Sequence, residues 1–185
     1  AGTFDVCEGT FTYRFNRRGR MILLYDFTYN KDEKMREIGL GFDVAKSFDR
    51  LSWQRNAQWT TYPAGHIGRP MGQARPYRDA SWPAPVRFSR PVWPWEMDGT
   101  EEGSNDFRST KRNIYWSSLT DDQGMGVFVH ADGTQHHRCY VNGNSIRLLV
   151  TDYCGAGNRR RASSMFKEIK PGDRLTGKVT LELGV

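Results

Sequence analysis

Aromatic and hydrogen-bonding side chains are concentrated in one long irregular stretch near the middle of the chain. The candidates for ligand contact in it are Trp82, Trp93, Trp95, Asn105, Asp106 and Arg108. Several prolines interrupt this stretch, and proline fixes the backbone and removes a hydrogen-bond donor, so the stretch cannot form a helix interior or a central strand. Because disordered segments are poor in aromatic residues, we expect an ordered, functional loop.

This combination of groups is suited to carbohydrate, because the C–H face of a sugar ring stacks on a flat aromatic and its hydroxyls need polar partners. The tryptophans would stack on sugar rings, and the amide, carboxylate and guanidinium would bind hydroxyls. Tyr153 and Arg159, in or beside a second loop, complete the predicted ligand-binding set. Two alternatives stay open: Trp93 and Trp95 could close the edge of the fold as a hydrophobic plug, and Arg108 could form a buried ion pair that fixes the loop.

The familiar signatures of catalysis are missing from the sequence, which holds no Gly-x-Ser-x-Gly, phosphate-binding loop or His-Glu-x-x-His motif. A glycosidase needs two facing carboxylates, whereas the acidic residues from Glu96 to Asp106 fall within one loop. We therefore expect no catalytic residue and no cofactor, with a structural Ca²⁺ on the oxygen-rich segment 98–106 as an alternative. The adjacent His136 and His137 would face opposite sides of a strand, so we interpret them as half-exposed strand residues and not as metal ligands.

The composition restricts the class of partner. The chain has 185 residues, enough for one domain over 1–185, and a net charge of +6. This charge is dispersed, with its densest cluster at Arg159-Arg160-Arg161, so we expect no nucleic acid partner but leave an acidic polysaccharide open. The longest apolar run, 21–25, is too short to span a membrane, and no membrane partner is expected. Three cysteines without regular spacing indicate neither a disulfide framework nor a zinc site, and Cys139 is predicted to be a buried thiol.

The elements that must position these residues are all predicted to be β-strands. Apolar runs bounded by turn residues predict strands over 11–15, 21–29, 36–44, 112–119, 125–130, 135–141, 145–151 and 175–183. Asp-Gly at 132–133 and Asn-Gly at 142–143 are strong hairpin signals, so the four strands between 112 and 151 are predicted to form one antiparallel meander. Many short strands and no amphipathic helix predict an all-β antiparallel sandwich, of the supersandwich (galactose-mutarotase-like) or jelly-roll-like kind.

Several segments together resemble a known domain. Phe48-Asp49-Arg50-Leu51-Ser52-Trp53-Gln54-Arg55, followed by Trp59, Tyr62-Pro63 and His66-Ile67-Gly68-Arg69, is similar to the C-terminal β-sandwich of family 2 glycoside hydrolases of β-galactosidase type. The segments 103–111 and 152–183 are similar to a later turn of that domain and to its final loop and strands. The likeness covers most of the chain as an order of strands and turn motifs.

The resemblance implies a domain that works beside a catalytic one. In the family, the catalytic acid and nucleophile belong to a separate barrel, and the final loop of the sandwich leans toward that barrel's active site and can supply an aromatic to the sugar. This chain has Tyr153 and Arg159 in the corresponding loop, which departs from a tryptophan there and puts galactose specificity in doubt.

The function expected from the residues and the resemblance is non-catalytic carbohydrate binding, as a carbohydrate-binding module or as an accessory domain of a glycoside hydrolase. The expected partners are an oligo- or polysaccharide and a catalytic glycosidase domain. One alternative is a purely structural domain that buttresses the barrel. Another is a stand-alone glycosidase, which would require two carboxylates roughly 5 to 10 Å apart across a cleft.

Overall fold

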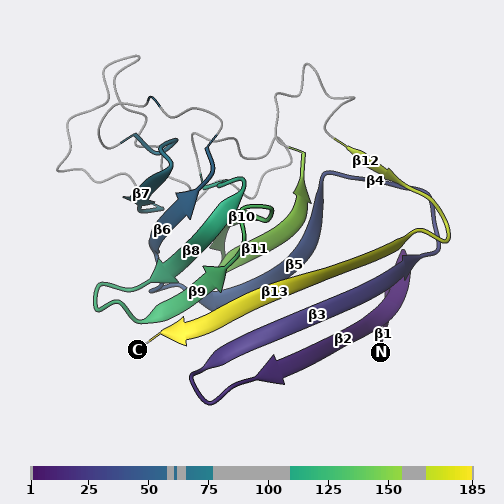
Figure 1. Ribbon diagram of the computed structural model, residues 1–185, viewed down its shortest axis with the longest axis horizontal. Helices are drawn as coiled ribbons and strands as arrows, with labels where there is room; N and C mark the ends of the chain where they lie inside the picture. The colour runs from purple at the N-terminus through teal and green to yellow at the C-terminus, as the bar shows by residue number, and fades with distance from the viewer. Residues whose placement is uncertain (1, 58–60, 62–65, 77–108, 156–165, 185) are drawn as a thin grey trace.

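The computed structural model describes residues 2–57, 61, 66–76, 109–155 and 166–184, and every regular element in this part is a β-strand (Figure 1). The strands are β1 (Gly2–Thr3), β2 (Cys7–Phe15), β3 (Arg20–Tyr29), β4 (Glu33–Met35), β5 (Glu37–Ala45), β6 (Arg50–Arg55), β7 (Met71–Ala74), β8 (Ile114–Thr120), β9 (Gly126–His130), β10 (His136–Asn142), β11 (Ser145–Cys154), β12 (Lys167–Ile169) and β13 (Arg174–Gly184). Among the described residues, no helix has the length and apolar character needed to cross a membrane.

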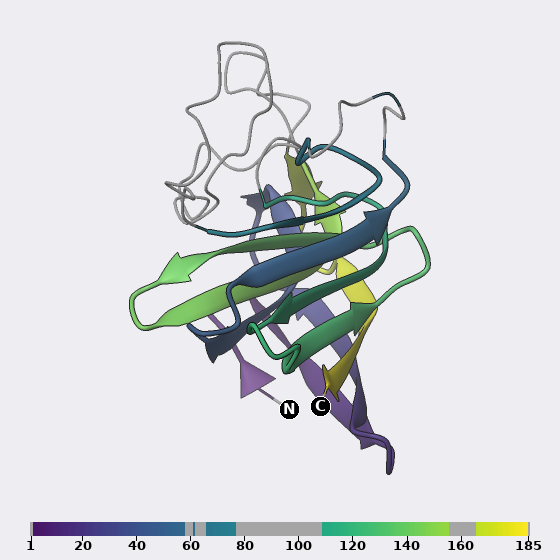
Figure 2. The ribbon, with the colours of Figure 1, turned by 90° about the vertical axis from the view of Figure 1, so that its left-hand side faces the viewer.

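The strands form a sandwich of two unequal antiparallel sheets. The larger has eight strands in the order β1-β2-β3-β13-β9-β8-β6-β7, and the smaller has three in the order β10-β11-β5. A two-stranded pair, β12 with β4, lies at one end. Figure 2 shows the smaller sheet lying against part of the larger one, while the β2–β3 hairpin reaches past it. The predicted all-β antiparallel fold is confirmed.

The β2–β3 hairpin joins two strands that the sequence predicts. Gly19 has a φ of 76°, a value that costs glycine little and other residues much, and the chain reverses there between Phe15 and Met21, which pair across the hairpin. The aromatic residues of β2 occur at every second position, and they lie on one face of the sheet because side chains two positions apart on a strand share a face.

The predicted meander is wrong at its middle turn. β8 pairs with β9 and β10 pairs with β11, but β9 takes β13 as its other neighbour and β10 belongs to the smaller sheet. The Asp132-Gly133 turn, in which Gly133 has a φ of 96°, therefore carries the chain from one sheet to the other. An Asp-Gly turn has the same local chemistry whether it joins neighbouring strands of one sheet or crosses between two sheets. Here it crosses, because the free edge of β9 is occupied by β13, a strand far away in the sequence.

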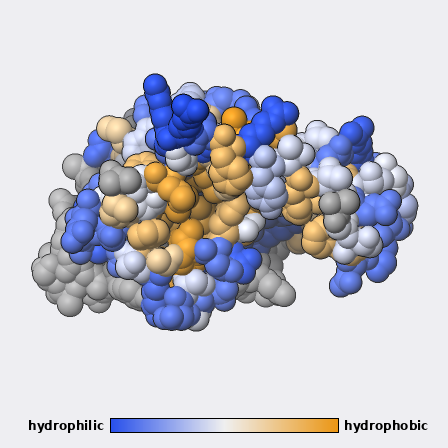
Figure 3. All heavy atoms as spheres, turned by 90° about the horizontal axis from the view of Figure 1, so that it is seen from below, coloured by the Kyte–Doolittle hydropathy of each residue, from blue (hydrophilic) through white to orange (hydrophobic). Residues whose placement is uncertain are grey.

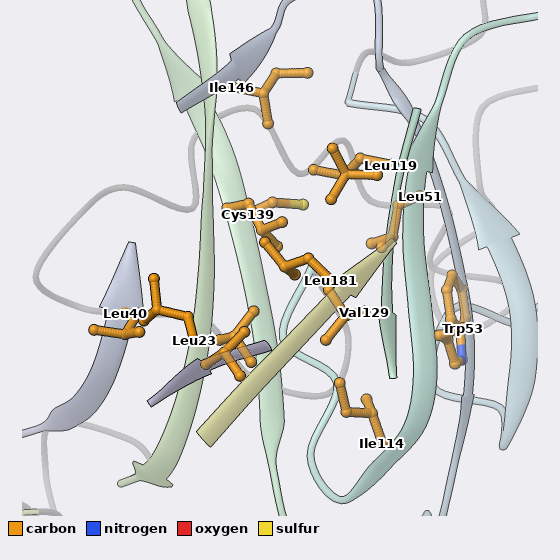
Figure 4. Close-up of a cluster of buried hydrophobic side chains, with 14 of the residues drawn as sticks. Leu23, Leu40, Leu51, Trp53, Ile114, Leu119, Val129, Cys139, Ile146 and Leu181 are labelled. Atoms are coloured by element: carbon orange, nitrogen blue, oxygen red, sulfur yellow. The ribbon is translucent and has the colours of Figure 1, made fainter. Parts of the chain in front are cut away.

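The core lies between the two sheets, and Figure 4 shows how their side chains meet there. Leu23 and Leu181 of the larger sheet pack in one buried cluster with Cys139 and Ile146 of the smaller sheet. Burying a leucine or isoleucine side chain contributes about 1.5 to 3 kcal/mol, so this cluster is a main source of stability. Cys139 is fully buried, as predicted, and all the cysteines are buried free thiols.

One end of the core face of the larger sheet is left uncovered by the described part of the smaller one. Tyr13, Phe15 and Leu183 are 54%, 73% and 65% exposed, and we call these three residues the apolar patch. Phe15 pairs with Met21, which packs against the core, so the patch continues the core face outward. Figure 3 shows apolar side chains gathered in the middle of this view of the molecule from below.

Candidate functional site

All but one of the predicted ligand-binding residues lie outside the described residues, namely Trp82, Trp93, Trp95, Asn105, Asp106, Arg108 and Arg159. The proposed calcium segment 98–106 lies outside them as well. Tyr153 is described: it is half-buried on β11 and packs beside a small cluster that includes Ile38 and Ile169. Its contact with sugar stays a prediction.

A group of polar side chains that the sequence did not single out meets at one end of the sandwich. Lys111 forms an antiparallel bridge with His137, which sets Arg112 opposite His136. Asp152 stands near the end of β11, and its carboxylate and the Arg112 guanidinium both act electrostatically on His136. We call Arg112, His136 and Asp152 the Arg112 site.

Asn113 gives the Arg112 site its local geometry. Its φ of 56° is the one positive value among the described residues other than glycine, and asparagine tolerates this left-handed conformation better than most residues. The turn aims the Asn113 backbone N–H at Nδ1 of His136, over 3.0 Å, while the Asn113 carbonyl accepts the N–H of Asn56 at 2.8 Å. A non-glycine residue in this conformation is a feature often found at functional sites.

The hydrogen bond from Asn113 fixes the tautomer of His136. Because Nδ1 accepts, the single proton of the neutral ring sits on Nε2. Burial, helped by the nearby Arg112 guanidinium and opposed by the Asp152 carboxylate, lowers the pKa of His136 to about 4. His136 is therefore neutral at pH 7, with an Nε2–H donor for which the described residues supply no acceptor.

Asp152 is an exposed carboxylate that is held in place by two hydrogen bonds. It occupies a bulge in the pairing of β11 with β5, and a bulge redirects a side chain. The Tyr25 hydroxyl donates to its Oδ2, and Nε2 of Gln135 donates to its Oδ1 at 2.8 Å. Burial, reinforced by the Asp152 carboxylate, raises the pKa of Tyr25, so the phenol remains a donor. The backbone beside this pair is Gly177, where a Cβ would overlap both the phenol and the carboxylate.

Arg112 departs from the usual pairing of buried charges. Its side chain is half-buried, and its Nε is fully buried without a hydrogen-bond partner. Within the described part of the chain, the guanidinium makes neither a hydrogen bond nor an ion pair. Arg138, on the neighbouring strand, by contrast forms an ion pair with Glu37. Buried polar groups without partners are rare in folded proteins, and each one calls for an explanation.

Arg112 also acts electrostatically on a buried thiol, that of Cys154. Burial and then the Glu37 carboxylate raise the pKa of Cys154 to about 12, and the guanidinium of Arg112 is the largest of the influences that lower it. Cys154 is therefore a neutral thiol at pH 7 and not a nucleophile. Arg112 thus acts electrostatically on both His136 and Cys154, and neither of these groups offers it a counter-charge.

The two adjacent histidines differ from their predicted exposure. His136 and His137 are only 7% and 1% exposed, so the interpretation as half-exposed residues is wrong. His137 points into the core, where its Nδ1 shares a hydrogen bond of 2.7 Å with the Ser117 hydroxyl, and burial followed by the charge of Lys111 lowers its pKa to about 3. The backbone bridge between Lys111 and His137 places the extended segment around Lys111 against β10, and this segment covers β10 there.

The sequence contains only a weak signal for the Arg112 site. Arg112, His136 and Asp152 lie in three separate segments, and no spacing rule relates them. Asn113 could have been noticed as a left-handed turn candidate ahead of a strand, because asparagine favours that conformation. No group of three or more His, Cys, Asp or Glu residues suited to a metal ion occurs among the residues described.

The chain is an antiparallel β-sandwich. No protein-family model matches it, and no curated protein matches it significantly. Among solved structures, it is similar to a galactose mutarotase related enzyme from Lactobacillus acidophilus, at 11% identity and a TM-score of 0.41. That similarity covers 97% of this chain and 62% of the enzyme, so the chain spans less than two thirds of the enzyme's length. The resemblance to the C-terminal sandwich of family 2 glycoside hydrolases stays a prediction.

Proposed function

We propose that the chain binds carbohydrate without catalysing a reaction on it, as a free-standing module or as an accessory domain of a glycoside hydrolase. The saccharide contacts the Arg112 site. The observation that carries this proposal is that a fixed acceptor lies near donors for which the described residues supply no partner. Asp152 is held by Tyr25 and Gln135, while the Arg112 guanidinium and the Nε2–H of His136 have no acceptor among the described residues.

This arrangement supports sugar as the ligand because each sugar hydroxyl both donates and accepts. A carboxylate takes the hydroxyl proton, and a guanidinium or imidazole N–H donates to the hydroxyl oxygen. The groups are held by the fold before ligand arrives, so binding orders few additional side chains. The same reasoning disfavours a purely apolar ligand, which would leave all of these polar groups without partners.

The predicted aromatic loop joins the chain next to this site. Its described end is anchored at Ser109, whose hydroxyl donates to the Cys139 carbonyl at 2.6 Å, and Arg112 follows within the same short segment. The second loop begins shortly after Asp152. Chain continuity therefore supports a sugar site in which Trp82, Trp93 and Trp95 supply the stacking surfaces and the Arg112 site supplies the hydrogen bonds.

The proposal is tested by affinity gel electrophoresis and calorimetry against neutral and acidic polysaccharides. We expect binding to at least one class, weakened about tenfold, or roughly 1.4 kcal/mol, in Asp152→Asn. Asp43→Asn is the matched control, because Asp43 is also a surface carboxylate but is paired with Arg147 away from the site. Binding to no saccharide, or full affinity in Asp152→Asn and His136→Gln alike, would overturn the assignment. Release of reducing sugar by the chain alone would overturn the non-catalytic part.

The apolar patch favours a second candidate function, that of a structural domain docked on a glycosidase barrel. The rings of Tyr13 and Phe15 lie 6.5 Å apart and almost parallel, and exposed apolar patches of this kind often mark contacts with another protein. We expect Phe15→Ser to weaken association with a joined or added barrel, measured by calorimetry, without altering saccharide affinity. Unchanged association would exclude the patch as the contact.

A further inference from the structure

The charge of Arg112, for which the described residues supply no counter-charge, indicates which saccharides fit. We infer that the Arg112 site binds the acidic group of an acidic saccharide, either a uronic acid carboxylate or a sulfate ester, with Arg112 as its counter-charge and His136 as a second donor. This inference rests on the proposed function and makes it more specific, because a neutral saccharide would offer the guanidinium hydroxyl oxygens but no counter-charge.

Arg112 has no counter-charge within the described part of the chain. Its Nε is buried, where water cannot replace a missing partner, and its guanidinium has no ion pair among the described residues. The nearby carboxylates are already engaged: Glu37 pairs with Arg138, and Asp152 accepts from Tyr25 and Gln135. A partly buried charge that the surrounding protein groups do not compensate is suited to a ligand or an ion of opposite charge.

The donors at the Arg112 site outnumber the acceptors. Arg112 brings a planar fork of N–H groups that matches the oxygens of a carboxylate or sulfate. His136 adds an Nε2–H, because its Nδ1 is occupied by the N–H of Asn113. An anionic group with several oxygens satisfies both donors at once, whereas a single hydroxyl cannot.

The negative charge of Asp152 would repel an anion placed against it. Its oxygens are directed by Tyr25 and Gln135, and it makes no ion pair with Arg112. A sugar unit that carries both hydroxyls and an acidic group suits this division, with a hydroxyl on Asp152 and the acid on Arg112. The formal net charge of +6 for the whole chain favours approach of an acidic polymer.

The experiment compares matched ligands that differ only in charge. Calorimetry would use oligogalacturonate against its methyl ester, and a sulfated galactan against the same galactan after desulfation, at low and moderate salt. We expect one acidic member to bind about tenfold more tightly than its neutral partner, as for a charge-assisted hydrogen-bonded pair. The arm that shows this preference identifies the acid as carboxylate or sulfate.

Substitutions of Arg112 test whether the preference for the acidic ligand arises at the Arg112 site. We expect Arg112→Gln to remove it and Arg112→Lys to retain part of it, since lysine keeps the charge without the fork. Arg147→Gln, at a surface arginine paired with Asp43, is the matched control and should change nothing. Thermal unfolding of each variant confirms that it is folded. If Arg112→Gln does not fold, the Arg112→Lys result alone decides, because loss of part of the preference is still required.

The outcomes separate the two proposals. Equal affinity for acidic and neutral members, unchanged in Arg112→Gln, would overturn the acidic-group inference while leaving carbohydrate binding intact. No affinity for any saccharide would overturn both. The inference would also be overturned if the preference for acidic polymers disappeared at moderate salt, extended to duplex DNA and survived in Arg112→Gln. The preference would then be general charge attraction.

Discussion

The backbone N–H of Asn113 donates to Nδ1 of His136 over 3.0 Å, and this one bond links the start of β8 to the start of β10. It depends on a left-handed backbone at Asn113, and it sets the proton of the neutral imidazole on Nε2. The same segment brings Arg112 opposite His136. A local conformational feature therefore determines both the position of the guanidinium and the chemistry of the ring beside it.

Asn113→Gly and Asn113→Ala test this role. Glycine adopts a φ of 56° without strain and keeps the N–H, so we expect the stability of that variant to change little. Alanine in the left-handed region costs about 1 kcal/mol or more, and we expect that loss in the free energy of unfolding measured with urea. Equal stability of the two variants would show that the left-handed turn is not maintained in solution.

The stability of the fold should fall as the pH is lowered from about 6.5. The folded-state pKa values of His136 and His137 lie near 4 and near 3, below the ordinary value of 6.5, so the unfolded chain binds protons first. Each histidine then removes about 1.4 kcal/mol for every pH unit between its unfolded and folded pKa. Urea unfolding at pH 7 and pH 5 measures this loss.

His136→Asn isolates the contribution of one of these rings. The amide oxygen of asparagine can accept the Asn113 N–H in place of Nδ1 but does not titrate. We expect this variant to lose less stability than the wild-type chain between pH 7 and pH 5. The same pH dependence in both proteins would contradict a buried neutral His136.

Gly177→Ala should damage the support of Asp152. The added Cβ would overlap the Tyr25 phenol and the Asp152 carboxylate, and such overpacking costs about 1 to 3 kcal/mol. We expect lower thermal stability together with weaker saccharide binding. Gly2→Ala is the control, because a Cβ there comes no closer than 3.7 Å to the Phe4 ring. Unaltered stability and affinity in Gly177→Ala would show that the contact is relaxed in solution.

The native thiols should react slowly with thiol reagents. Cys7, Cys139 and Cys154 are all buried, and burial raises the pKa of Cys154 to about 12, so little thiolate forms at pH 8. A colorimetric thiol assay at pH 8 should show little reaction in buffer and full reaction of the three cysteines in urea. Rapid labelling of the folded chain would contradict the buried, protonated state.

The sequence by itself determined the strands and their local turns. The alternating residues around Phe11 and Tyr25, with Gly19 between them, specify a hairpin because period-two alternation and a left-handed glycine are local properties. The predicted burial of the Cys139 thiol is confirmed.

Only the tertiary structure decided which strands became neighbours and which polar groups came together. The Asp132-Gly133 turn crosses between sheets because β13, distant in sequence, fills the edge of β9. The Arg112 site depends on a bridge to β10 and on a bulge in β11 that redirects Asp152. Such long-range pairings are set by the burial of both sheets at once, and no local pattern in the chain specifies them.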